Sequence, residues 1–221
     1  MKNNSALKLN SSTIQSRLGL CAAALAGTAA AVPTAEATVI VNNTTYVIPM
    51  TFAGIYLNFL TGVAGASAGA NPGWDFNPYA TGGTGPLGFY WAPTPAGSSG
   101  GVSTGAGSSV YADLAIGTVV SSSSPFTNAI GGTAPTYRTV GTHILGFRFF
   151  NEATSAINFG YLTIQIGGTN GFPATITEYR YENSGGAITV VPEPSTVALL
   201  TIAALALGAS GVRKWRQQQA A

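Results

Sequence analysis

Cysteine and charge are what this sequence has least of. A single cysteine, Cys21, occurs in 221 residues, and only 7% of the residues are charged. Cys21 lies in an N-terminal apolar stretch, so the rest of the chain forms no internal disulfide and must be stabilised by packing. There is also only one histidine, His143, so the sequence has no set of zinc ligands. It has no phosphate-binding loop and no dinucleotide-binding fingerprint either.

The positive charges are concentrated at the two ends of the chain. The formal net charge is +2, yet residues 38–190 hold three arginines and five carboxylates. That region has no basic cluster, so the sequence predicts no nucleic-acid partner. Its polar surface must consist of Ser, Thr, Asn, Gly and Tyr, a composition typical of proteins that lie among extracellular sugars. The charged residues are Arg138, Arg148, Arg180, Asp75, Asp113, Glu152, Glu178 and Glu182.

Residues 1–37 have the parts of a secretory signal peptide. Positive charges precede an apolar stretch, 18–31, and Ala35 and Ala37 supply the small residues of a cleavage site. The mature chain is therefore predicted to begin at Thr38. Lipidation of Cys21 is disfavoured, because Leu20 precedes it where a small residue is needed. The positive charges are Lys2, Lys8 and Arg17.

The C-terminal end carries an apolar run, 197–212, rich in Leu and Ala. As a helix this run would span about 24 Å, which is short of the roughly 30 Å hydrocarbon core unless its flanks extend it. The basic cluster that follows predicts a single transmembrane helix with a cytoplasmic C-terminus. Ahead of the run, prolines 192 and 194 keep the preceding residues extended, as a processing enzyme requires. The flanking residues are Pro192, Glu193 and Pro194 before the run, and Arg213, Lys214 and Arg216 after it.

This order of parts, over residues 191–216, resembles the PEP-CTERM sorting signal. The resemblance implies recognition by an exosortase, a membrane transpeptidase-like cysteine protease. It also implies a Gram-negative bacterium that makes exopolysaccharide, with an inner-membrane-anchored precursor that later reaches the cell surface or the medium. The alternative is an ordinary tail anchor with a proline-rich stalk. The predicted organisation is a signal peptide (1–37), an ectodomain (38–190) and the sorting signal (191–216).

Between the two ends, nearly every local signal predicts β-strand. No segment has a sustained 3.6-residue period, and Gly and Pro interrupt the chain throughout. Short strands at this spacing predict an all-β ectodomain, a β-sandwich or jelly roll. The length of about 150 residues suits one domain. The predicted strands are 55–60, 87–92, one or two within 110–120, 143–150, 158–166, 175–181 and 187–191, with a hairpin over 39–48 that turns at Asn42-Asn43-Thr44.

Two strands alternate clearly enough to assign their faces. The first places His143, Leu145, Phe147 and Phe149 on one side. The second places Leu162, Ile164 and Ile166 inward and Tyr161, Thr163 and Gln165 outward, and residues 152–156 join the two strands as a hairpin loop. By contrast, the Gly/Ser stretch 96–109 predicts a long surface loop.

The ectodomain also looks like the globular part of many PEP-CTERM proteins. This second resemblance implies a similar fold and location, and it transfers no catalytic residue. The matching segments are 55–59, 72–78, 145–152, 159–162 and 171–176.

A group of aromatic and amide side chains is the candidate binding site. Aromatic faces stack on sugar rings, and Asp or Asn side chains bond the hydroxyls. The alternative is that Trp74 and Phe76 fill the end of the sandwich while Asp75 caps a turn. No cofactor is predicted, although Asp75 and Asn77 could join Asp113 in a calcium site. The candidate sugar-binding residues are Trp74, Asp75, Asn77, Tyr90 and Trp91.

Catalytic constellations have little support in the sequence. A glycosidase needs two facing carboxylates, and the domain offers only five. Glu178, Arg180 and Glu182 share one face of a strand. This spacing predicts a solvent-exposed ladder of charged side chains. A Ser-His-Asp triad would have to use His143, which sits on an apolar face and is more typical of a structural histidine. Three hypotheses remain, in this order: a non-enzymatic surface or biofilm-matrix protein associated with exopolysaccharide, a lectin-like module, and a glycan-cleaving enzyme.

Overall fold

A computed structural model of the chain describes residues 37–130 and 135–192. Most of the predicted signal peptide, including Ala35, lies outside the described residues. Three further predicted parts also lie outside the described residues: the rest of the Pro-Glu-Pro motif after Pro192, the span 197–212, and the basic cluster Arg213, Lys214 and Arg216. Within the described ranges, no helix has the length and apolarity needed to cross a membrane.

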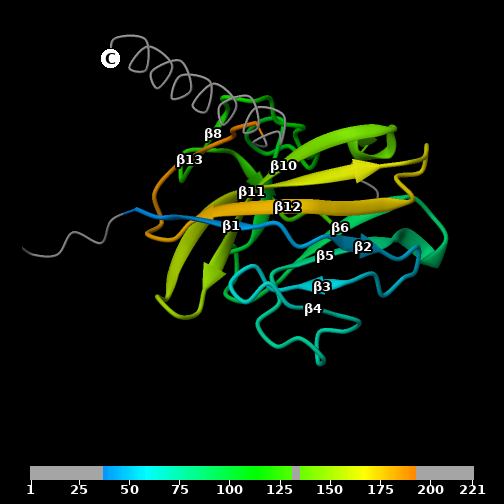
Figure 1. Cartoon of the computed structure of the whole chain (residues 1–221), viewed down its shortest axis with the longest axis horizontal. Coiled ribbons are helices and arrows are strands. Elements are labelled where there is room, and N and C mark those ends of the chain that lie inside the picture. Colours follow the sequence, from blue (N-terminus) through cyan, green and yellow to red (C-terminus); the bar gives the residue numbers. More distant parts are fainter. Residues whose placement is uncertain (1–36, 131–134, 193–221) are drawn as a thin grey trace, which may run out of the picture. The chain divides into compact units, whose positions relative to one another are not determined.

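The described part of the chain is built almost entirely from strands, as predicted (Figure 1). Two short 3-10 turns, η1 (Thr81–Gly83) and η2 (Pro135–Arg138), are the helical elements of this part. The strands are β1 (Val39–Asn42), β2 (Tyr46–Ile48), β3 (Tyr56–Leu57), β4 (Ala64–Gly65), β5 (Phe76–Ala80), β6 (Leu87–Trp91), β7 (Gly100–Val102), β8 (Val119–Val120), β9 (Phe126–Thr127), β10 (Gly141–Asn151), β11 (Ala156–Ile166), β12 (Ala174–Glu182) and β13 (Ile188–Thr189).

The largest sheet has seven strands, in the order β1-β12-β11-β10-β7-β9, with β2 also paired to β12. The predicted hairpin loop after β10 is confirmed, because β10 and β11 pair antiparallel from end to end. The predicted hairpin between β1 and β2 is wrong, since both strands pair with successive stretches of β12. Asn42 explains the difference. Its side-chain Oδ1 accepts a hydrogen bond from the backbone N–H of Thr44, and its side-chain Nδ2 donates to the Tyr179 hydroxyl. The chain therefore bends locally without reversing.

A four-stranded sheet, β4-β3-β5-β6, packs against one face of the seven-stranded sheet, which gives a sandwich-like arrangement. The predicted inward residues of β10 and β11 line this core, in which Phe59 stacks on Phe147 with ring centroids 4.0 Å apart. Strand β3 is shorter than predicted, but Leu57 and Phe59 are fully buried, as the alternation of residues 55–60 requires.

The opposite face of the seven-stranded sheet is partly covered by the two-stranded sheet β13-β8. Val120, Ile188 and Val190 pack there against Tyr161 and form a second apolar cluster. Tyr161 and Thr163 were predicted to face outward into solvent, and both are buried, at 1% and 6% exposure. Strand β11 therefore has cover on both faces, which the alternation of a single strand cannot reveal.

The predicted surface loop 96–109 is wrong at its centre. Strand β7, Gly100–Val102, pairs with β10 on one side and β9 on the other, and it is buried. A Cβ on Gly101 would lie 2.7 Å from the Tyr111 ring and 3.0 Å from the Trp91 ring. Glycine is used here for close packing of the backbone against aromatic rings, whereas Gly105 and Gly107 have open space around them.

Candidate functional site

The five predicted sugar-binding residues divide between the two faces of the four-stranded sheet. Asp75, Asn77 and Trp91 are buried, at 2%, 3% and 2% exposure, and Trp74 and Tyr90 are half-buried. Tyr90 and Trp91 are neighbours on β6 and so point to opposite faces, whereas Asn77 lies opposite Tyr90 on β5 and shares its face although it is buried. The group is therefore not one site.

Asp75 has a structural role. Its Oδ2 accepts a hydrogen bond from the backbone N–H of Phe59 at 2.8 Å. Burial raises the pKa of this carboxyl to about 8, although the bond from Phe59 lowers it, and the nearby Glu152 adds to the rise. The carboxyl is thus mostly protonated at neutral pH, which makes it a poor calcium ligand. No three His, Cys, Asp or Glu side chains gather as a metal site in the described ranges.

Asn77 and Trp91 also use their polar atoms inside the protein. The Asn77 amide donates to the carbonyls of Ala53 and Ile55, at 2.8 and 2.7 Å, and so ties the segment before β3 to β5. Trp91 Nε1 donates to the Tyr111 hydroxyl at 2.9 Å. These two side chains therefore do not donate hydrogen bonds to a ligand as the lectin hypothesis predicted.

A different set of residues forms an aromatic site on the outer face of the four-stranded sheet. We define it as Phe52, Tyr56, Trp74, Tyr79 and Tyr90. The Trp74 ring lies edge-on to Tyr56 at 4.9 Å and tilted against Tyr90 at 5.4 Å, and Phe52 lies edge-on to Tyr79 at 5.9 Å. Beside them is an open pocket of about 290 Å³, lined by Phe52, Tyr56, Asn77, Tyr79, Tyr90 and Ile130.

The chemistry of this aromatic site is apolar with a few hydroxyl groups. The residues that line its pocket carry no charge. Exposed rings offer stacking surfaces to the C–H faces of a sugar, and the tyrosine hydroxyls can donate or accept hydrogen bonds. Sequence reasoning missed Tyr56 and Phe52. The alternation of β3 could have found Tyr56, since its neighbour Leu57 is an obvious core residue.

The carboxylates of β12 do not form the predicted solvated ladder. Glu178 is 5% exposed and pairs with Arg180 Nη2 at 2.9 Å. Glu182 is also buried, and it accepts hydrogen bonds from the backbone N–H groups of Ser184 and Gly186 in the turn after β12. Both carboxylates therefore stabilise the fold locally. The pocket beside the aromatic site has no carboxylate in its lining.

His143 is held between two acceptors. Its Nδ1 lies 2.7 Å from Asp113 Oδ2, and its Nε2 lies 3.0 Å from the carbonyl of Thr139. The Thr139 hydroxyl is 3.4 Å from Nε2, but it donates its own proton to the Thr136 carbonyl. Asp113 also accepts from the backbone N–H of Ile144, so the pair ties the 113 segment to β10. A catalytic triad needs a hydroxyl that donates to the imidazole, which Thr139 does not do.

Arg148 lies over an aromatic ring. Its guanidinium carbon is 4.7 Å from the centroid of the Phe126 ring. Burial lowers the pKa of Arg148 below its usual value. This contact joins β10 to β9 across β7 and stabilises the edge of the seven-stranded sheet.

Comparison with known proteins finds no matching family model, curated protein or solved structure.

Proposed function

We propose that the protein is exported and then sorted through its C-terminal segment, as a PEP-CTERM-type substrate of an exosortase. The observation that carries this proposal is the position at which the folded domain ends. Val190 is buried and its backbone N–H bonds to the Thr118 carbonyl, while Val191 and Pro192 are exposed. The Pro-Glu-Pro motif thus begins at an exposed residue, two positions after the buried Val190, where a processing signal is accessible.

The rest of the proposal follows from the sequence. Residues 1–37 direct export, and the span 197–212 with its basic end holds the precursor in the inner membrane. Processing then releases the ectodomain to the cell surface or the extracellular matrix. Its weakly charged surface suits a non-enzymatic protein that lies among neutral polysaccharide, as in a biofilm.

Substitution within the motif tests the sorting proposal. Pro192→Ala with Glu193→Ala should leave a full-length, membrane-held form in cells that contain the exosortase, detected by fractionation and immunoblot. The matched control is Pro72→Ala with Glu152→Ala, another exposed proline and glutamate of the same chain. A mature surface protein that still contained Trp215 in unmodified cells would sink the proposal.

A second candidate function is lectin-like binding of glycan at the aromatic site. The supporting observation is the cluster of half-buried rings, Tyr56, Trp74 and Tyr90, beside an uncharged pocket. Co-sedimentation of the processed protein with exopolysaccharide from the source cells, with and without calcium, measures binding. Release of reducing ends, measured in the same samples, would instead indicate a glycan-cleaving enzyme. We expect binding that is independent of calcium and leaves the reducing ends unchanged.

A further inference from the structure

The last residues before the Pro-Glu-Pro motif are an integral part of the fold. Strand β13 pairs with β8, Val190 N–H donates to the Thr118 carbonyl and Gly117 N–H donates to the Val190 carbonyl, both at 2.8 Å. Ile188 and Val190 are 4% and 1% exposed, and both belong to the second apolar cluster. The backbone N–H and C=O groups of Val190 are therefore already hydrogen-bonded within the fold.

This arrangement limits where a processing enzyme can cut. Enzymes that act on peptides bind the substrate backbone in extended form through its N–H and C=O groups. The backbone groups of Val190 are already paired inside the domain, and removing its side chain would open the apolar cluster. Val191, the next residue, is exposed, and its N–H donates to the Tyr161 hydroxyl at 3.3 Å. The accessible bonds thus begin after Val191.

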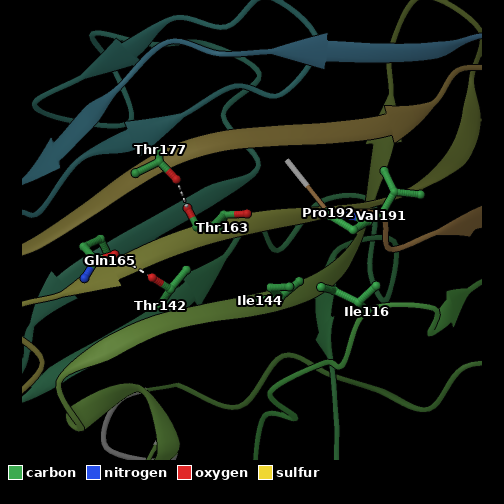
Figure 2. A pocket seen from close by; sticks show the side chains of 8 residues that line it. All are labelled: Ile116, Thr142, Ile144, Thr163, Gln165, Thr177, Val191 and Pro192. Carbon is green, nitrogen blue, oxygen red and sulfur yellow. Dashed lines mark hydrogen bonds between the residues drawn. The ribbon is translucent and has the colours of Figure 1, made fainter. Parts of the chain in front are cut away.

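An uncharged groove lies next to this exit point (Figure 2). Its floor is the outer face of β10, β11 and β12, and Val191 and Pro192 form part of its wall. Within it the Thr142 hydroxyl donates to Gln165 Oε1 at 2.6 Å. The groove has a volume of about 310 Å³ and is lined by Ile116, Thr142, Ile144, Thr163, Gln165, Thr177, Val191 and Pro192.

Chain length places this groove near the membrane. The five residue steps from Pro192 to Val197, where the predicted span begins, cover at most about 17 Å when fully extended. An enzyme embedded in the membrane that grips residues 193–196 must therefore touch the surface around Pro192. That surface is apolar and exposed, because Ile116 and Val119 are 62% and 52% exposed.

We propose that this groove is the docking surface for the membrane-embedded processing enzyme, and that cleavage falls after Val191. The inference rests on the proposed sorting function. It adds that the folded ectodomain, and not only the Pro-Glu-Pro peptide, is part of what the enzyme recognises. Threonine hydroxyls, one amide and branched apolar side chains fit a partner surface that is likewise uncharged.

Ile116→Arg tests the docking surface in the full-length protein. Ile116 is highly exposed, so the domain should still fold, which resistance to added protease checks. Pulse-chase measurement in cells with the exosortase should show processing slowed roughly tenfold or more. The matched control is Val63→Arg, which is 52% exposed beside β4 and should be processed within about twofold of the natural rate.

A flexible Gly/Ser linker inserted between Val191 and Pro192 distinguishes binding of the enzyme to the groove from steric hindrance by the folded domain. The insertion keeps the motif at its natural distance from the span and moves it away from the groove. If the groove binds the enzyme, processing should slow severalfold, and Ile116→Arg should add little in the linker form. Faster processing of the linker form, or restored processing of its Ile116→Arg variant, would overturn the docking proposal.

Mass spectrometry of the processed protein tests the cleavage limit. Its C-terminal peptide should retain Val190 and Val191, and a product that lacks Val191 would overturn the inference. These outcomes are distinguishable from failure of the proposed function. If Pro192→Ala with Glu193→Ala is processed normally, sorting through the motif is wrong, whereas normal processing of Ile116→Arg alone rejects only the docking surface.

Discussion

The two faces of the four-stranded sheet are both rich in aromatic residues, yet they have different roles. On the inner face Phe76, Phe89 and Trp91 are buried against the seven-stranded sheet. On the outer face Tyr56, Trp74 and Tyr90 remain partly exposed, beside an open pocket. Because successive side chains of a strand point to opposite faces, position along the strand, and not composition, decides which rings stabilise the fold and which are free to bind a ligand.

The largest expected effect comes from truncating the inner face. Phe89 contacts Phe76, Tyr111 and Tyr137, with ring centroids 5.2 to 5.3 Å apart. Phe89→Ala should therefore lower the free energy of unfolding by about 3–5 kcal/mol, measured by urea denaturation of the processed form. The control is Tyr90→Ala, its neighbour on the outer face, for which we expect a loss of about 1 kcal/mol or less. Equal losses would contradict the comparison.

The pH dependence of stability should come largely from Asp75. This residue directly precedes β5 and lies in the sequence between Trp74, on the outer face, and Phe76, on the inner face. The folded pKa of about 8 lies above the unfolded value near 3.8, so the folded state holds the proton more tightly. Stability should be highest below pH 4 and fall as the pH rises toward 8, by at most about 1.4 kcal/mol per pH unit.

Asp75→Asn removes this titration and keeps an oxygen that can accept the hydrogen bond from Phe59 N–H. Thermal or urea unfolding at pH 5 and pH 7 should show a smaller difference for Asp75→Asn than for the natural protein. The variant should also be the more stable of the two at pH 8. A natural protein that gained stability between pH 5 and pH 7 would show that Asp75 is charged in the folded state.

Packing behind the inner face can be tested at Gly101. A Cβ at this position would meet the ring of Tyr111 at 2.7 Å and that of Trp91 at 3.0 Å, so Gly101→Ala should cost about 1–3 kcal/mol. Gly105→Ala is the matched control, because nothing lies within 4 Å of its Cβ position. Urea denaturation should rank the two clearly, and a neutral Gly101→Ala would mean that β7 can move away from the rings.

The sequence predicted local patterns well and long-range cover poorly. The alternation over β10 and β11, the loop between them and the inward faces of Leu145 and Leu162 could all be deduced from a period of two residues. The cover provided by β13 and β8 could not, because nothing in β11 indicates that Tyr161 meets Val190. Likewise β1 and β2 have the pattern of a hairpin, although their true partner, β12, lies more than a hundred residues away.

Glycine was the other source of error. The stretch 96–109 has the composition of a flexible loop, yet Gly100 and Gly101 belong to a buried strand. The space of a side chain is occupied by the backbone of Thr127 at Gly100 and by the rings of Tyr111 and Trp91 at Gly101. The candidate site shows the same limit. The sequence placed Trp74 and Tyr90, which are half-buried on the outer face, in one group with Asp75 and Trp91, which are buried.

The smallest effect on stability, and the sharpest test of the outer face, is expected for Trp74→Ala. Trp74 is half-buried, and its ring pairs with Tyr56 and Tyr90 on the outer face, so the free energy of unfolding should change by about 1 kcal/mol or less. If the outer face binds glycan, co-sedimentation with exopolysaccharide should nevertheless fall about tenfold, since ring stacking is lost. Trp74→Phe, which keeps a stacking ring, should retain most of the binding. A large loss of stability with unchanged binding would show that Trp74 supports the fold in the same way as the rings of the inner face.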